Sequence, residues 1–331
     1  MKKIITFLIS VIFVLGLTGC GKITKKDVIN KTNKKIEKTN GYLVKAEMEL
    51  INNEDKYKYD VIVSYKKDDY FRVSLLNKNN NHEQIILRNK DGVYVLSPSL
   101  NKSFKFQSKW PYNNSQSYLM QSVINSIKND SKATMKNTKD GYVIKSTVDF
   151  KNNKQLKYQE VYINKNYIIK KVVVYDTDNN PKICVKYNEV DMKAKFDNNY
   201  FSLKENMETS KIKDEKPTNY KETVYPMYLP EGTYLKNEKT VDLDKGSRVI
   251  LTFAGNDEFM LVEEPAIASS SLSVIPSSGD IDMIADSIAI IDSTSISWVS
   301  GGTEYYLVSN DLSKSEMISV AQSISSMPIS K

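Results

Sequence analysis

The alternation of apolar and polar residues in the first two hundred positions constrains the fold more than any other feature. Between residues 42 and 50, apolar residues occupy every second position and alternate with Lys45, Glu47 and Glu49. The same period returns between Tyr57 and Tyr65 after a polar turn. Successive side chains of a strand point to opposite faces of a sheet, so this pattern predicts strands with one apolar and one wetted face.

More strands and two helices are predicted in the same part of the chain, with turns such as Asp91-Gly92 and Asp140-Gly141 between them. The further strands are expected at 70–76, 84–88, 93–97, 103–107, 142–149, 156–163, 167–175 and 182–191. Helices are expected at 27–38 and 117–128, the second with an apolar face of Met120, Val123, Ile124 and Ile127. We therefore predict a curved, open, antiparallel half-barrel sheet with covering helices.

The first twenty residues have the form of a lipoprotein export signal. Lys2 and Lys3 precede an uncharged apolar run, and Leu17-Thr18-Gly19-Cys20 has the shape of a bacterial lipobox. Cleavage before Cys20 and attachment of a diacylglycerol to its thiol would anchor the mature chain. The alternative is an uncleaved transmembrane helix, but the run is shorter than the roughly 20 residues that a membrane span needs.

The anchor predicts a protein at the extracytoplasmic face of the cell membrane. Two acyl chains hold a protein firmly where one gives only transient binding, and Lys22, Lys25 and Lys26 can contact anionic headgroups. Lipidation uses Cys20 and leaves Cys184 as the second of two cysteines, so no disulfide is expected. Because the chain is exported, nucleic acid is not expected as a partner.

Charge divides the chain into two parts. Residues 21–213 contain 37 basic and 22 acidic residues, whereas residues 214–331 contain 8 and 18. We expect a half-barrel domain at 21–205, a linker at 206–222 and a smaller α+β domain at 223–331. The basic domain could face anionic lipid or wall polymer, or the two surfaces could simply attract each other and dock.

The second domain is predicted to combine strands with one closing helix. Strands are expected at 233–241, 247–254, 258–263 and 295–309. Ser313 and Glu316 form the pattern of a capping box, which predicts a helix from this point with Met317, Val320, Ala321 and Ile324 on one face.

Several segments resemble the LolA-like superfamily. Tyr70-Phe71-Arg72-Val73, the hairpin at 91–95, Trp110 and the segment 197–201 follow one another in the order found in that superfamily, which also includes RseB-like regulators. Residues 225–232 and 298–307 resemble a small DUF4367-like domain. With the lipobox, the chain resembles two-domain lipoproteins of endospore-forming bacteria related to the germination lipoprotein GerS and the sporulation lipoprotein YdcC. The resemblance implies a role in spore formation or germination.

The sequence offers little for catalysis, and we predict no catalytic, cofactor or metal site. The single histidine, His82, lies in an asparagine-rich segment typical of a hairpin tip, although it could be a general base. Cys184 lies in a predicted strand, where a small buried hydrophobe is commoner than a nucleophile. No group of cysteine and histidine residues has the spacing of a metal site.

Aromatic residues are the remaining candidates for a ligand or partner surface. Tyr57, Tyr59 and Tyr65 could line the concave face of the sheet, where they would offer apolar area and a polar tip. Trp110 and Tyr112 could form a lid over an apolar ligand, or their loop could simply pack on the core. If the helix at 117–128 fills the hollow, no ligand fits.

Two functions are therefore considered. The first is a non-catalytic, membrane-anchored protein that binds a protein partner, which by resemblance to GerS could be a cortex peptidoglycan amidase. The second is a carrier or sensor of a lipid or lipoprotein acyl chain in the half-barrel cavity. A continuous apolar cavity of roughly 300 Å³ or more would favour the second function. A third function, cell-wall hydrolase, lacks the residues it would need.

Lipidation at Cys20 is open to direct measurement. Mass spectrometry of the native protein should find a chain that begins at Cys20 and carries the mass of a diacylglycerol, because the lipobox directs both steps. An intact, unacylated N-terminus would contradict the prediction.

Overall fold

The computed structural model describes residues 23–52, 55–112, 115–197, 199–209 and 223–324. The predictions for the signal at 1–20, for Cys20 and for most of the linker at 206–222 concern residues outside these ranges. Among the described helices, none has the length and apolar character needed to cross a membrane.

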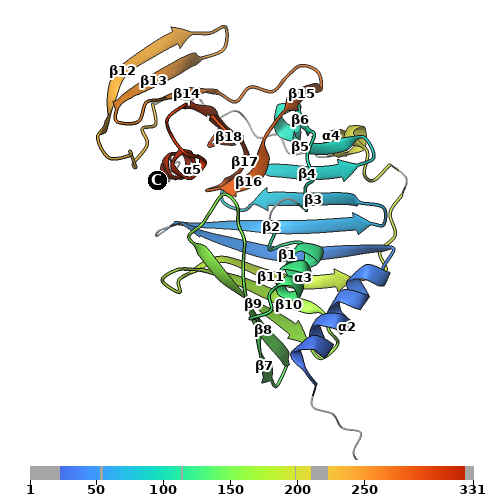
Figure 1. Cartoon of the computed structure of the whole chain (residues 1–331). Coiled ribbons are helices and arrows are strands. Elements are labelled where there is room, and N and C mark those ends of the chain that lie inside the picture. The colour runs from blue at the N-terminus through green and yellow to red at the C-terminus, as the bar shows by residue number, and fades with distance from the viewer. Residues whose placement is uncertain (1–22, 53–54, 113–114, 198, 210–222, 325–331) are drawn as a thin grey trace, which may run out of the picture.

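A twelve-stranded, strongly curved sheet forms the larger part of the molecule (Figure 1). Its order is β15-β6-β5-β4-β3-β2-β1-β11-β10-β9-β8-β7, and every pair but β15–β6 is antiparallel. The strands are β1 (Gly41–Asn52), β2 (Asp55–Lys66), β3 (Tyr70–Asn77), β4 (Glu83–Asn89), β5 (Gly92–Ser97), β6 (Lys102–Phe106), β7 (Thr134–Thr138), β8 (Gly141–Thr147), β9 (Leu156–Asn164), β10 (Ile169–Asp176), β11 (Pro181–Asp191) and β15 (Ser273–Ser277). This confirms the predicted half-barrel.

The alternating pattern explains why the sheet has an apolar concave face. Val44 of β1 pairs with Val63 of β2, and Met48 pairs with Tyr59; all four side chains are buried. The charged residues between them, such as Glu47, face the opposite side and are exposed. Register keeps each apolar set on one face, because a shift by one residue would move the whole set to solvent.

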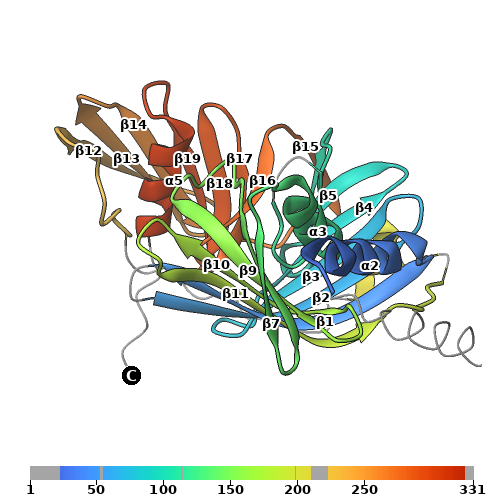
Figure 2. The same cartoon turned by 60° about the horizontal axis from the view of Figure 1, so that its bottom comes forward.

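Two helices lie against the concave side, α2 (Lys25–Lys38) and α3 (Met120–Asn129) (Figure 2). Thr24 and Asp27 form a capping box at the start of α2. All four predicted apolar residues of α3 are buried in the same core cluster as the sheet. Tyr42 donates to Gln121 of α3, and Tyr187 of β11 donates to the Ser117 carbonyl at 2.7 Å. The helix therefore fills this part of the hollow.

A smaller helix covers part of the outer surface. The helix α4 (Leu203–Thr209) and the segment before it pack Phe201 and Met207 on Ile85, Leu87 and neighbouring residues of β4 and β5. A 3-10 helix, η1 (Pro98–Leu100), joins β5 to β6. The outer face of these strands is consequently buried as well.

A second, seven-stranded antiparallel sheet follows, with the order β12-β13-β14-β19-β18-β17-β16. Its strands are β12 (Thr233–Asp242), β13 (Ser247–Gly255), β14 (Phe259–Pro265), β16 (Asp280–Ile284), β17 (Ser287–Ile291), β18 (Ser295–Ser300) and β19 (Thr303–Val308). The helix α5 (Lys314–Ser323) covers one face and begins with the predicted capping box. Met317, Val320 and Ala321 of α5 lie in this second core, so the predicted α+β character is confirmed.

Residues 264–294 differ most from the sequence analysis, which assigned them no strand. They contain β15, β16 and β17, and β15 leaves the second sheet's region to pair with β6 of the first. The chain thereby covers the edge of the half-barrel with a strand that lies about 170 residues further along. The two parts of the molecule are joined by backbone hydrogen bonds and not only by a linker.

Filling of the hollow by α3 can be tested by truncating Ile124, which is 1% exposed. We expect Ile124→Ala to lower the free energy of unfolding by about 2–5 kcal/mol, because it removes buried methyl groups and leaves a cavity. Asn125→Ala, at the exposed neighbouring position, should change it by less than about 0.5 kcal/mol. Urea unfolding measures both; equal, small effects would mean that α3 does not pack as described.

Candidate functional site

The open end of the half-barrel is closed by the turn between β16 and β17. Tyr59 of β2 donates its hydroxyl to the Ala285 carbonyl at 3.1 Å, and Asn77 donates to the Asp286 carbonyl at 3.0 Å. Ala285 has a φ of 46°, so the turn is tight. Ile281 and Ile288 of the hairpin join the core cluster of the first sheet. The hairpin and α3 together occupy the concave side.

Gln84 of β4 holds the start of β17. Its side-chain oxygen accepts from the Ile288 backbone N–H at 2.7 Å and from the Ser287 hydroxyl at 3.2 Å. All three residues are buried. Since a buried N–H without an acceptor is costly, Gln84 is a structural link between the two sheets.

Asp286 is a buried carboxyl at this junction. It is 8% exposed and accepts from Ser300 at 2.9 Å and Asn80 at 3.2 Å. Burial raises its pKa above the ordinary value, although the hydrogen bond from Ser300 acts in the opposite direction. These two hydrogen-bond partners come from the two different sheets, Ser300 from β18 and Asn80 from the turn between β3 and β4, which indicates a structural role for Asp286.

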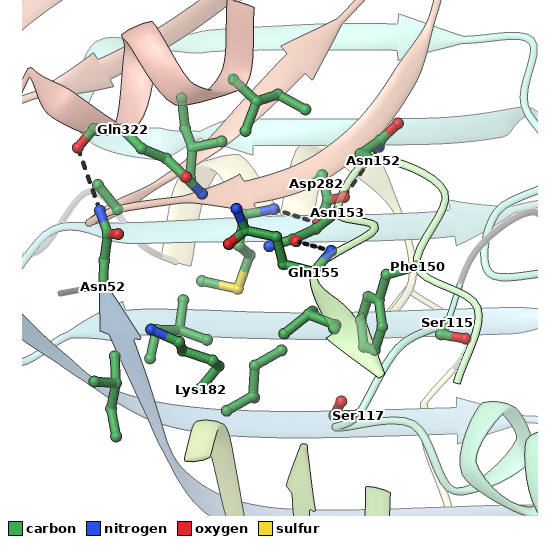
Figure 3. Close-up of a pocket in the computed structure, with 18 of the residues that line it drawn as sticks. Asn52, Ser115, Ser117, Phe150, Asn152, Asn153, Gln155, Lys182, Asp282 and Gln322 are labelled. Atoms are coloured by element: carbon green, nitrogen blue, oxygen red, sulfur yellow. Dashed lines mark hydrogen bonds between the residues drawn. The ribbon is translucent and has the colours of Figure 1, made fainter. Parts of the chain in front are cut away.

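A pocket of about 150 Å³ remains between the half-barrel and the second sheet (Figure 3). Its lining includes Met48, Tyr57 and Phe150. It also includes two side-chain amides: Asn52 donates to the Gln322 carbonyl at 3.3 Å and Asn152 to Asp282 at 3.0 Å. Burial raises the pKa of Tyr57 to about 12. A cavity of this size accommodates about one six-membered ring, so it has no room for an acyl chain.

The five predicted aromatic residues do not form one site. Tyr57 lines the pocket, and Tyr59 is 2% exposed and bonded to the hairpin. Tyr65 lies at the other end of β2 with Trp110 and Tyr112. The strand separates the two groups by more than 15 Å, because each residue of a strand adds about 3.3 Å.

The second aromatic group is a packed cluster around Phe71. Its ring centroid lies 4.9 Å from Tyr65, 5.9 Å from Trp110 and 6.4 Å from Tyr112. Trp110 is 1% exposed, so this loop packs on the core. Tyr112 is 53% exposed, and its hydroxyl donates to Asp69 at 2.6 Å. The partial burial of its ring raises the pKa of Tyr112, and the hydrogen bond to Asp69 raises it further.

A second hollow, of about 290 Å³, lies between the concave side of β4–β6 and the face of the second sheet that α5 does not cover. Most of its wall is apolar and comes from Val95, Leu100, Phe104, Val262, Ile290 and Val299. Lys102 and Glu304 form an ion pair at its margin. This cleft was not expected, because its two walls come from segments roughly 160 to 200 residues apart in the chain.

The isolated reactive side chains have no catalytic setting. Burial lowers the pKa of His82, and its nearest hydroxyl, that of Ser99, is 3.5 Å away. Cys184 is half-buried in β11, and burial raises the pKa of its thiol, which keeps it protonated and weakly nucleophilic. No group of three metal-ligating side chains occurs in the part of the chain that the structure describes.

Exposed apolar side chains gather beside the edge strand β12. We call Tyr225, Met227, Tyr228 and Leu235 the β12 patch; Met227 is 82% exposed. Tyr234, the neighbour of Leu235 in the strand, is also exposed but points to the opposite face of the sheet. Tyr225 donates to Glu238 of β12 at 2.6 Å, which holds the segment against the strand. In Figure 1, β12 and β13 project from the body at the end farthest from α2. No prediction from the sequence covered this patch, although a tyrosine- and methionine-rich stretch beside Pro226 and Pro230 marks part of it.

Comparison with known proteins places this architecture among the YdcC-like proteins. A family model described as sporulation protein YdcC-like matches residues 1–201. The chain is 34% identical over 327 residues to the sporulation protein YdcC of Bacillus subtilis (strain 168), covering 98% of this chain and 97% of that protein. The predicted resemblance to this group is thereby confirmed, while the DUF4367-like resemblance of the second domain stays a prediction.

Two solved structures have a similar arrangement. The MucA/MucB complex of Pseudomonas aeruginosa contains a chain with 11% identity and a TM-score of 0.34, covering 89% of this chain and 97% of that one. The complex of the CwlD amidase with the GerS lipoprotein from Clostridioides difficile contains a chain with 21% identity and a TM-score of 0.31, covering 54% of this chain and 98% of that one.

The link between the two sheets can be tested at Gln84. Gln84→Ala removes the acceptor of the buried Ile288 N–H, so we expect the free energy of unfolding to fall by about 1–3 kcal/mol. Hydrogen exchange at the Ile288 amide should accelerate. Gln107→Ala, at an exposed position of the same domain, should leave both quantities unchanged. Unaltered exchange at Ile288 in the Gln84 variant would contradict the assignment.

Proposed function

Because the chain belongs to the YdcC-like family of sporulation proteins, we propose that it is a non-catalytic lipoprotein that binds a protein partner during spore formation or germination. Cys20 anchors it at the extracytoplasmic face of the cell membrane. The half-barrel and the second sheet together form its binding body.

The structural roles of the buried polar side chains support a binding function over a catalytic one. The buried polar side chains at the junction hold the β16–β17 hairpin, as Gln84 and Asp286 do. His82 and Cys184 have no paired acid or base of the kind that activates a nucleophile. Nothing in the described residues combines nucleophile, base and oxyanion donors in one place.

The observation that carries the proposal is the filled hollow. A carrier needs an internal cavity for its cargo, and here α3 and the β16–β17 hairpin occupy much of the concave side. They leave a pocket of about 150 Å³ and a hollow of about 290 Å³, neither of which exceeds the roughly 300 Å³ at which ligand pockets begin. Binding is therefore expected on the outside of the molecule.

The β12 patch is the outer surface best suited to a protein partner. Its aromatic and methionine side chains are of the types enriched at interfaces. The strand beside it is an edge strand, so its free backbone groups can pair with an extended segment of the partner. An apolar patch of this kind on an exported protein is typical of an interaction site.

The resemblance to the germination lipoprotein GerS suggests the class of partner. We infer that the partner is a cortex peptidoglycan amidase, which the lipoprotein would hold near the membrane and support in its active form. This part of the proposal rests on the sequence resemblance, and the structure contributes the surface.

One specific observation favours the second function, a carrier or sensor of an acyl chain. The apolar cleft of about 290 Å³ between the two sheets approaches the size of a ligand pocket. A carrier or sensor of an acyl chain would use this cleft, which lies on the concave side of β4–β6. Tyr306, which is 48% exposed, lines it.

The partner surface can be tested with the double variant Met227→Asp, Leu235→Asp. Crosslinked wild-type protein from sporulating cells is expected to co-purify with a peptidoglycan amidase. Because an apolar anchor contributes about 2 kcal/mol or more, the variant should bind the purified amidase at least about 30-fold more weakly.

The matched control is Met260→Asp, Tyr306→Asp, which alters two partly exposed apolar residues on the opposite face of the second sheet. It should bind the amidase like the wild type. Loss of binding in the control alone would move the interface to the cleft. Recovery of phospholipid without any amidase would favour the acyl-chain function and contradict the proposal.

A further inference from the structure

The short segment between Cys20 and α2 limits the distance between the membrane and the folded part of the protein. The helix α2 begins at Lys25, five residues after Cys20. Five residues span at most about 18 Å. If the thiol of Cys20 carries the lipid, as the proposed function requires, the start of α2 lies within that distance of the bilayer surface. The body of the protein therefore approaches the membrane with this end.

The outward face of α2 is basic. Lys26, Lys34 and Lys38 are separated by multiples of four residues and form one row along the helix, and all three are exposed. Lys35 is exposed beside them. No salt bridge involves any of these lysines among the residues that the structure describes.

The two acidic residues of this helix accept hydrogen bonds from neighbouring residues of the chain. Asp27 accepts from the Thr24 N–H and hydroxyl in the capping box, which lowers its pKa. Glu37 accepts from Asn33 at 2.8 Å. Two carboxylates against six lysines leave the helix with a clear positive excess.

The neighbouring hairpin extends the same surface. Lys25 donates to the carbonyl of Ala133, and Lys31 donates to Tyr167 at 3.1 Å, so α2 is held beside β7 and the turn between β9 and β10. Lys132, Lys136 and Lys139 of the β7–β8 region are exposed there. Figure 2 shows α2 and β7 side by side at the front of the molecule.

One apolar side chain accompanies the lysines. Ile23 lies immediately before the cap of α2 and is 38% exposed. An exposed isoleucine between the anchor and a basic helix fits the interfacial region of a bilayer, where apolar side chains enter the headgroup boundary and lysines remain at its surface.

We propose that α2 and the β7–β8 hairpin form a membrane-contact surface that binds anionic phospholipid headgroups. This inference rests on the anchoring at Cys20 included in the proposed function. The contact fixes the orientation of the half-barrel, with α2 on the bilayer. The β12 patch then points away from the membrane, since it lies at the opposite end of the molecule (Figure 1). Contact with the bilayer thereby directs the partner surface outward.

Vesicle binding by the unlipidated chain tests the surface without the anchor. The chain from Gly21 onward, which contains every described residue, is mixed with vesicles of phosphatidylcholine alone or of phosphatidylcholine with phosphatidylglycerol. We expect binding only to the anionic vesicles, and its loss as the salt concentration approaches about 1 M, where charges are screened within about 3 Å.

The triple variant Lys26→Gln, Lys34→Gln, Lys38→Gln should lower vesicle affinity on the order of 100-fold, because each lysine near an anionic surface contributes about a factor of five. The matched control is Lys58→Gln, Lys90→Gln, Lys186→Gln, which removes the same charge from exposed positions on β2, β11 and the β4–β5 turn. The control should bind like the wild type. Equal thermal melting midpoints show that both variants fold.

Three outcomes would overturn the inference. Absence of binding to anionic vesicles would do so, as would an equal loss in both variants, which would mean a general charge effect. Binding to a glycerol-phosphate wall polymer but not to vesicles would assign the surface to the wall. Detergent phase partition of the full-length chain reports lipidation at Cys20 separately, so a failure of the anchor is distinguishable from a failure of this surface.

Discussion

Coverage of the apolar concave face of the twelve-stranded sheet is the constraint on which the rest of this structure depends. A curved sheet with valine, methionine and tyrosine on its inner face cannot leave that face in water. The helix α3 covers one part through Val123 and Ile124, and the β16–β17 hairpin covers the other through Ile281 and Ile288. Since the hairpin belongs to the second sheet, covering the first core also docks the two sheets. The same packing divides the remaining space into hollows of about 150 and 290 Å³.

The edges of the two sheets differ in strand pairing, charge and exposed apolar side chains. The edge at β6 is paired with the short strand β15, which becomes the terminal strand of the sheet. The edge at β7 carries Lys136 and threonines, and charged edge residues discourage pairing with another chain. The edge at β12 is exposed along nearly its whole length and carries Tyr234 and Leu235. The open edges thus differ in chemistry. In the proposed arrangement, the basic one lies at the membrane and the apolar one is turned toward a partner.

The parts of the fold that could be predicted have short-range signals. Alternation placed Tyr57 and Tyr59 on the concave side, and the i, i+3, i+4, i+7 spacing identified the buried face of α3. Asp140-Gly141 marked a turn, where a Cβ on Gly141 would lie 2.1 Å from the Ile163 carbonyl oxygen. The strand β15 was missed, because Ser273–Ser277 is a short serine-flanked segment whose partner strand is far away in the chain.

The sequence by itself determined the element types, the turns and which side chains must leave water, because helix period, strand period and glycine turns act between near neighbours. It also predicted no catalytic or metal-binding motif. Only the tertiary structure decided that the tyrosines of β2 are divided between a hairpin contact and an aromatic cluster. It alone decided which apolar residues stay exposed, as Met227 does. Exposure depends on which distant segment returns to cover a surface, and no local pattern encodes that return.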